Sequence, residues 1–122
     1  MHHEAATDAL KVETVRSQST DVRGRALVSA RTQHFVVDSS TGPGEALFPA
    51  EVFLAGISAC GVHLTERFAD EFGIPLRKVD VTIESARLLS APATFRSVEL
   101  RFVLDGPTQA QAERLVEAYQ AR

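Results

Sequence analysis

The chain has 122 residues, which allows one domain with a modest hydrophobic core and is too short for two independent domains. Its apolar fraction of 44% and charged fraction of 24% are typical of a folded globular protein, and its net charge of −3 opposes binding to nucleic-acid phosphates. A single cysteine cannot form an intramolecular disulfide and matches no closed zinc site. We therefore expect no metal, and a reducing, cytoplasmic compartment.

The N-terminal region has the features of neither a signal peptide nor a membrane segment. MHHEAATDAL has acidic residues where a signal peptide needs an apolar core. No stretch of the sequence reaches the ~18 to 20 uncharged apolar residues of a membrane span, so no membrane partner is expected. Residues 1–9 are polar and are predicted to be a flexible tail.

Residue patterning predicts three strands in the first third of the chain. The runs 10–18, 23–31 and 34–38 alternate between apolar and polar residues or are rich in β-branched and aromatic ones. Three successive strands at this spacing predict an antiparallel meander. The segment 39–44 is rich in Ser, Gly and Pro and is predicted to be a loop.

A long apolar helix is predicted over residues 49–72, and it contains the only cysteine, Cys60. Pro49 suits the first turn of a helix, and Gly73 followed by Pro75 ends it. At ~3.6 residues per turn, six apolar residues fall along one stripe, which predicts that the thiol lies on a buried seam. These residues are Phe53, Ile57, Cys60, Leu64, Phe68 and Phe72.

Small residues are dense in the middle of this helix. A glycine inside a helix costs ~1 kcal/mol relative to alanine, so its presence indicates that another segment approaches closely. Two interpretations fit equally well: an equal helix of a second chain packs here, or the small residues fit beneath a curved sheet. The residues are Ala55, Gly56, Ser58, Ala59 and Gly61.

The last third of the chain predicts a hairpin and a second helix. The runs 79–89 and 95–104 alternate on either side of a turn at 90–93. Thr108 with Gln111 three residues later has the form of a capping box, and an amphipathic pattern follows it.

The predicted element order is βββ-α-ββ-α, which defines an α+β fold. We expect a single domain over residues 1–122. The amphipathic pattern of the last helix continues to about residue 121. The sequence stops at Arg122 without a cap for this helix, as expected if the natural protein is longer.

Cys60 is the candidate nucleophile, and nucleophilic chemistry requires its thiolate. A free thiol has a pKa of about 8.5 and apolar burial raises it, so a cation must be brought near. His63 follows Cys60 by one helical turn and Arg67 by two, so both project near the same face. The plainer interpretations are a partly buried structural histidine and, for Arg67, a solvated ion pair with acidic neighbours.

Glu51 is the other candidate site residue. A carboxylate in the first turn of a helix is favoured by the helix dipole, which is a sufficient structural explanation. Glu51 is nine residues before Cys60, or about half a turn out of phase, so the two cannot share one face of a straight helix. A joint site requires that the helix begin after Glu51 or that the carboxylate serve another subunit.

The segment HFVVDSSTGPGEALFPAEVFLAGISACGVHL resembles the OsmC/Ohr family (osmotically inducible protein C and organic hydroperoxide resistance protein). The similarity runs from about Val22 to the end of the chain. Its most specific part is Pro49-Ala50-Glu51 followed by Leu54-Ala55 and Ser58-Ala59-Cys60, with Asp38 closing the preceding strand. The family includes thiol-dependent peroxidases that reduce organic hydroperoxides in oxidative-stress defence.

The resemblance implies an OsmC-like fold and an intertwined homodimer whose central helices pack together inside a wrapped sheet. It implies that Cys60 is the peroxidatic thiol and passes through a sulfenic acid. An arginine near the start of the second strand supports the thiolate in the peroxidases. Arg23 is its counterpart, with Arg25 as the alternative. No cofactor is implied beyond an external thiol or dithiol reductant.

Two departures from the peroxidase pattern matter, and the first is the arrangement of the broader OsmC-like branch. Ala50 follows the proline directly and Glu51 comes one position later, where the organic hydroperoxide branch has its acidic residue next to the proline. The family's second, resolving cysteine lies shortly after the last helix, about where this sequence ends. The alternative function is a non-catalytic dimer that binds a small apolar ligand at the subunit interface, with Cys60 as a small hydrophobic residue.

Overall fold

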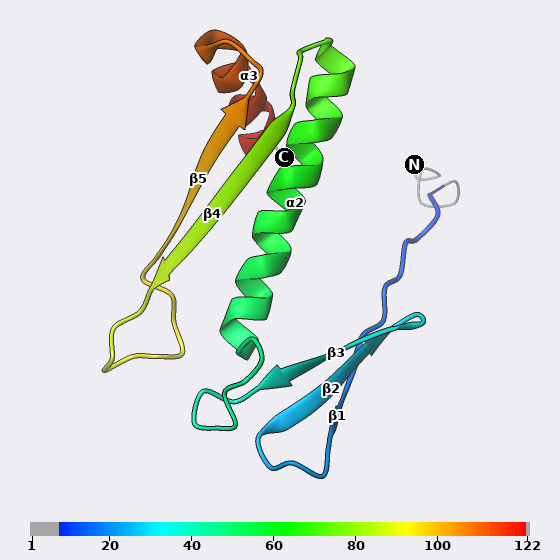
Figure 1. Cartoon of the computed structure of the whole chain (residues 1–122), viewed down its shortest axis with the longest axis vertical. Coiled ribbons are helices and arrows are strands. Elements are labelled where there is room, and N and C mark those ends of the chain that lie inside the picture. Colours follow the sequence, from blue (N-terminus) through cyan, green and yellow to red (C-terminus); the bar gives the residue numbers. More distant parts are fainter. Residues whose placement is uncertain (1–7, 122) are drawn as a thin grey trace, which may run out of the picture. The chain divides into compact units, whose positions relative to one another are not determined.

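The structure is a computed structural model and describes residues 8–121. The chain folds into two compact units, one that runs to Pro49 and one that starts at Ala50, and the single-domain interpretation stays a prediction. The elements follow in the predicted order βββ-α-ββ-α (Figure 1). Within this described part no helix is long and apolar enough to cross a membrane. The predicted tail over residues 1–9 falls mostly outside the described residues.

The first unit contains an antiparallel sheet with the strand order β1-β2-β3. β1 spans Arg16–Ser19, β2 spans Arg25–Ala30 and β3 spans Gln33–Asp38. The central strand contributes Val28 and the third strand contributes Val37 to the interior, each 8% exposed. The predicted meander is confirmed.

The first strand is shorter than predicted. Residues 10–15 form no strand, although their alternation predicted one. Pairing begins with Arg16 opposite Ser29, and in this register Val15 would already reach Ala30, the last residue of β2. Residues 10–14 run past that end and have no partner strand within the described chain. Their apolar side chains therefore remain in contact with solvent, and Leu10 is 90% exposed.

α2 spans Pro49–Phe72, the bounds that the sequence predicts. It ends at Gly73, whose φ of 67° lies in the left-handed region that glycine adopts without strain. The N–H of Ile74 donates to the carbonyl of Ala69 at 2.9 Å, and the N–H of Gly73 donates to the carbonyl of Asp70 at 3.4 Å. This is a Schellman motif, and it also brings Ile74 into the core beside Ala69.

Cys60 does not lie on the buried side of α2, so the prediction that its thiol is buried was wrong, whereas Leu64, Phe68 and Phe72 of the predicted stripe do pack in the core. The buried residues of α2 include Gly61, Thr65 and Phe68, whereas Cys60 is exposed. Each step of four residues around a helix drifts by roughly 40°, so two such steps turn Cys60 about 80° away from Phe68. Phe53, at the start of the predicted stripe, is also exposed, at 57%.

The second unit contains a hairpin of β4, Lys78–Ala86, and β5, Ser97–Asp105. The predicted hairpin is confirmed, and Figure 1 shows its strands alongside α2. The connection is longer than the predicted turn at 90–93, because β4 ends at Ala86 instead of 89 and β5 begins at Ser97 instead of 95. The loop 87–96 joins them. Within this loop the guanidinium of Arg87 lies 5.5 Å from the centre of the Phe95 ring.

The two glycines inside α2 have different surroundings. Gly61 is buried, and a Cβ on it would lie 3.5 Å from Val81 and Phe102 of the hairpin. Gly56 is exposed, and a Cβ on it would meet nothing within 4 Å. The sheet interpretation therefore explains Gly61, while contacts among residues 8–121 give no reason for Gly56.

α3 spans Gln109–Gln120 and begins with the predicted capping box. The Thr108 hydroxyl accepts from the N–H of Gln111 at 3.2 Å, and the Gln111 side chain accepts from the N–H of Thr108 at 2.9 Å. Leu115 of α3 is fully buried. It forms the core of the second unit with Phe68, Ala69 and Ile74.

Candidate functional site

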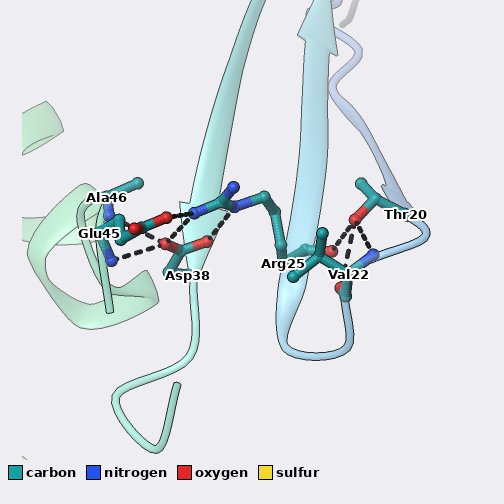
Figure 2. A network of polar contacts seen from close by, with 6 residues as sticks. All are labelled: Thr20, Val22, Arg25, Asp38, Glu45 and Ala46. Carbon is teal, nitrogen blue, oxygen red and sulfur yellow. Dashed lines mark hydrogen bonds and ion pairs between the residues drawn. The ribbon is translucent and has the colours of Figure 1, made fainter. Parts of the chain in front are cut away.

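A bidentate ion pair joins Arg25 at the start of β2 to Asp38 at the end of β3 (Figure 2). Nε of Arg25 donates to Oδ1 of Asp38 at 2.8 Å, and Nη2 donates to Oδ2 at 2.9 Å. The two residues are opposite each other in the antiparallel register, so the sheet itself brings them together. Asp38 is completely buried, and the Arg25 side chain is 23% exposed. The planar guanidinium fits this two-point contact as an ammonium could not.

Asp38 also holds the loop that leads to α2. Its Oδ2 accepts from the backbone N–H groups of Glu45 at 2.8 Å and Ala46 at 2.9 Å. The hydrogen bond from Arg25, helped by those two N–H groups and opposed by burial, lowers the pKa of Asp38 from 3.8 to about 2. At neutral pH the buried carboxylate is therefore charged and paired.

Glu45 is the second carboxylate partner of Arg25. Nη2 of Arg25 donates to Oε1 of Glu45 at 2.8 Å, and the Glu45 side chain is 74% exposed. The hydrogen bonds to Asp38 and then to Glu45 raise the pKa of Arg25. These contacts occupy Nε and Nη2 and leave the Nη1 amino group without an acceptor among residues 8–121.

The turn before β2 fixes the backbone of Arg25. The Thr20 hydroxyl lies 3.2 Å from the carbonyl oxygens of both Val22 and Arg25 and accepts from the N–H of Val22 at 3.1 Å (Figure 2). Gly24 has a φ of 91°, and a Cβ on it would collide with the carbonyl oxygen of Gly42. Only glycine therefore allows the turn and the loop after β3 to approach this closely.

A shallow pocket of about 400 Å³, largely open to solvent, lies beside this network in the first unit. Arg25 and Asp38 form part of its wall, next to the apolar side chains of Ala26, Val37 and Pro49. The walls therefore combine apolar side chains with the charged pair of Arg25 and Asp38.

The structure distinguishes the two candidate arginines. Arg23 lies exposed in the turn before β2 and makes no ion pair within the described chain. Arg25 is held by two carboxylates. Sequence reasoning favoured Arg23, and it gave Asp38 and Glu45 no role in a site.

Cys60 is an exposed free thiol on α2. His63, one turn later, has a side chain that is 78% exposed, with Nδ1 at 3.7 Å from Oε1 of Glu66, so the expectation of a partly buried histidine was wrong. Nε of Arg67 lies 3.9 Å from Oε2 of Glu71, with both side chains at least half exposed. The plainer interpretation of Arg67 as a solvated ion pair is confirmed.

Glu51 is exposed in the first turn of α2. Because α2 is continuous from Pro49, the alternative in which the helix begins after Glu51 was wrong. A joint role of Glu51 and Cys60 stays a prediction that requires a second copy of the chain. Within residues 8–121 no group of three or more His, Cys, Asp or Glu side chains could hold a metal ion.

Comparison with known proteins assigns the fold. The elements define an α+β protein in which a long helix links a three-stranded meander to a hairpin and a second helix. A family model described as OsmC-like protein matches residues 42–122, more than half of the chain. The chain belongs to the OsmC family, as its resemblance predicted.

Solved structures share this fold at low sequence identity. An OsmC-like protein from Mycoplasma pneumoniae has a TM-score of 0.80 at 13% identity, covering 92% of this chain and 82% of that one. A hypothetical protein from Aquifex aeolicus has 0.76 at 14% identity, covering 88% and 78%. An organic hydroperoxide resistance protein OsmC from Legionella pneumophila, described as a predicted redox protein, has 0.69 at 24%, covering 90% and 82%. No curated protein is a significant sequence match.

Proposed function

We propose that this protein is a thiol-dependent peroxidase that reduces organic hydroperoxides in defence against oxidative stress. The observation that carries the proposal is Cys60, an exposed thiol on α2 within the part of the chain that matches the OsmC family. Reactive cysteines are accessible, whereas structural cysteines are buried and inert. The Legionella protein, described as an organic hydroperoxide resistance protein, supports this chemistry.

The proposed reaction begins with the thiolate of Cys60. The sulfur attacks the terminal oxygen of the hydroperoxide, a sulfur–oxygen bond forms, the oxygen–oxygen bond breaks, and the alkoxide leaves and takes up a proton to become the alcohol. The sulfur gives up two electrons and becomes a sulfenic acid. An external thiol condenses with the sulfenic acid and releases water, and a second thiol then frees Cys60 and leaves as the external disulfide. A dithiol supplies both steps from one molecule.

An arginine and Glu51 complete the proposed site. A guanidinium near the sulfur stabilises the thiolate, and Glu51 is proposed as the carboxylate that accompanies it. Arg23 and Arg25 are the candidates for the guanidinium. The ordered side chain of Arg25, held by Asp38 and Glu45, favours Arg25.

We further propose a cytoplasmic homodimer in which the α2 helices of two copies pack together inside a wrapped sheet. The support for the dimer is the exposed side of α2, which offers Ala55, Gly56 and Ala59. A second helix backbone can approach closely over such small residues. The exposed Phe53 lies on the same helix and adds apolar surface.

Replacing Cys60 with Ser tests the mechanism. The parent is expected to consume cumene hydroperoxide in the presence of dithiothreitol, and Cys60→Ser is expected to fall to the background rate. Ser58→Ala is the matched control, because it removes a hydroxyl from the same stretch of α2 and leaves the thiol in place. Turnover that is unchanged in Cys60→Ser rules the mechanism out.

The alternative is a non-catalytic dimer that binds a small apolar ligand at the subunit interface. The observation in its favour is the exposed ring of Phe53, which stacks on Phe95 with the ring centres 5.9 Å apart. The rate of Cys60 alkylation at neutral pH separates the two functions. A rate above that of free cysteine favours catalysis, and a rate at or below it favours binding.

A further inference from the structure

A serine and a histidine are hydrogen-bonded across the first sheet, and the proposed reaction uses neither. Oγ of Ser29 in β2 lies 2.8 Å from Nδ1 of His34 in β3. We propose that these two residues form, with Arg16 of β1, a pH-dependent binding site for a small oxyanion such as phosphate or sulfate. The site takes up the anion when His34 is protonated. This proposal depends neither on Cys60 nor on a second copy of the chain.

The antiparallel register places the three residues in one row across the sheet. Arg16 is opposite Ser29, and Ser29 is opposite His34. Directly opposed residues project from the same face of a sheet, with roughly 4.5–5.5 Å between their Cβ atoms. Arg16 and His34 are exposed, and Ser29 is half-buried. One face of the sheet therefore presents a guanidinium, a hydroxyl and an imidazole side by side.

The charges around this row favour an anion. Within residues 8–121, Arg16 and His34 make no ion pair, and neither does Arg31 in the turn between β2 and β3. The three strands place one carboxylate on the same face, that of Asp38, which is bound to Arg25. At ~3.3 Å per residue Asp38 is about 13 Å along β3 from His34, and exposed charges are largely screened beyond about 10 Å. The positive charge of the row is therefore not neutralised by a neighbour on its own sheet.

A proton on His34 changes what the row offers to an anion. In a neutral imidazole with its proton on Nε2, Nδ1 accepts from the hydroxyl of Ser29, so the hydroxyl has no donor left for a ligand. In the imidazolium both ring nitrogens carry protons, so Nδ1 donates to Oγ of Ser29 and the hydroxyl can donate elsewhere. The contact of 2.8 Å fits both arrangements. Protonation therefore adds a positive charge and a hydrogen-bond donor at the same place.

The expected pH dependence follows from the residue types. Histidine is the side chain that ordinarily changes charge between pH 5 and 8, whereas an arginine such as Arg16 stays charged throughout. Hydrogen bonds from charged donors to an oxyanion are roughly twice as strong as those between neutral groups. The row should bind an oxyanion at mildly acidic pH and release it as the pH rises, because His34 then loses its charge and again accepts the hydroxyl proton of Ser29.

The next row on the same face would contact an organic group attached to the anion. Leu27 is opposite both Gln18 and Val36 in this row, and Val36 is 39% exposed. Inorganic phosphate and phenyl phosphate distinguish a free ion from a phosphate ester. We expect phenyl phosphate to bind at least about threefold more tightly, because its ring can lie over Val36. Equal or weaker binding of the ester would restrict the site to the free ion.

Sulfate is the probe for the pH dependence, because it keeps both negative charges over the range in which histidine titrates. The backbone amide signals of isotope-labelled protein are followed by NMR as sulfate is added at constant ionic strength, at about pH 5.5 and about pH 8. We expect saturable shifts that centre on Arg16, Ser29 and His34. The affinity for sulfate should be at least about tenfold higher at the lower pH.

Three variants separate a built site from general attraction between charges. His34→Gln should bind weakly at both pH values and lose the pH dependence. Arg16→Gln should weaken binding at both values and keep the pH dependence. Ser29→Ala leaves the net charge unchanged, yet it should weaken binding at the lower pH by at least about threefold, because it removes the hydroxyl donor.

Two further variants are matched controls. His63→Gln removes a histidine whose neighbour is a carboxylate, that of Glu66 at 3.7 Å. Ser17→Ala removes a hydroxyl from β1 at the residue after Arg16, which projects from the opposite face of the sheet. Both should bind sulfate as the parent does at both pH values.

The outcomes are distinct. Equal sulfate affinity at the two pH values overturns the proposal, and so do shifts that centre on another part of the chain. A folded Ser29→Ala variant with the parental affinity at the lower pH also overturns it, because diffuse attraction between charges needs no hydroxyl. If Ser29→Ala does not fold, the exposed position of His34 decides the question, since a pH dependence retained in His34→Gln overturns the proposal.

Discussion

Gly61 of α2 faces Phe102 of β5 so closely that a Cβ on the glycine would lie 3.5 Å from two ring carbons. That separation is an ordinary van der Waals contact, so a methyl group fits. We expect Gly61→Ala to raise the free energy of unfolding by up to ~1 kcal/mol, because alanine is the better helix former. Gly61→Leu should lower it by about 1–3 kcal/mol, because the larger side chain must displace Phe102 and Val81. Urea denaturation measures both, and a strong loss in the alanine variant would contradict the contact geometry.

Gly56 gives the complementary prediction for the proposed dimer. In the part of the chain that the structure describes, a Cβ at this position meets nothing within 4 Å, so Gly56→Ala should make the isolated subunit more stable by up to ~1 kcal/mol. If the helices of two copies approach closely here, Gly56→Leu should weaken the dimer by at least about tenfold. Sedimentation velocity over a concentration series measures the dissociation constant. A dimer of parental affinity in the leucine variant would place the interface elsewhere.

Asp38 predicts an acid-sensitive component of stability. Its pKa is about 2 in the folded protein and 3.8 ordinarily, so the unfolded chain takes up the proton first as the pH falls. The stabilisation is fully present above pH 3.8 and is lost as the pH approaches 2. Asp38→Asn should be less stable than the parent at neutral pH and lose less stability across this acid range. Urea unfolding at several pH values measures how the free energy of unfolding changes with pH in the parent and in Asp38→Asn. The same change with pH in both proteins would contradict the ion pair.

The capping box of α3 predicts that truncating the Thr108 side chain destabilises the helix. Thr108→Ala removes the acceptor for the N–H of Gln111, which should lower the free energy of unfolding by ~1 kcal/mol. Thr108→Ser keeps the hydroxyl and should retain most of the stabilisation that the cap provides. Thermal unfolding followed by circular dichroism compares the two variants. Equal melting temperatures for alanine and serine would show that the cap contributes nothing.

Local sequence signals accounted for most of the fold. Pro49, Gly73 and the Thr108 capping box fixed the helix ends because each acts through backbone geometry within a few residues. The absence of a strand over residues 10–15 could not be predicted from their alternation, because a strand needs a partner and β2 ends too early to supply one.

The inward side of α2 and the polar network were harder to predict. Cys60 falls on the apolar stripe of the sequence, but the hairpin packs against the side of α2 that contains Gly61. Because α2 is apolar over much of its surface, its sequence does not show which side the hairpin contacts. The pairing of Arg25 with Asp38 did have a signal. The short turn at Arg31 fixes the register between β2 and β3, which places these two residues opposite each other.

The strands of the hairpin pair over nine residues each, and the loop 87–96 joins them. Doubling the length of such a connection costs only about 0.6 kcal/mol in closure entropy. With Leu89 at 99% exposure, its tip suits the insertion of a fluorescent reporter or an affinity peptide. An insertion beside Leu89 keeps Phe95, whose ring stacks on Phe53 of α2, in the chain, so subunit exchange could be followed in a protein that retains this contact.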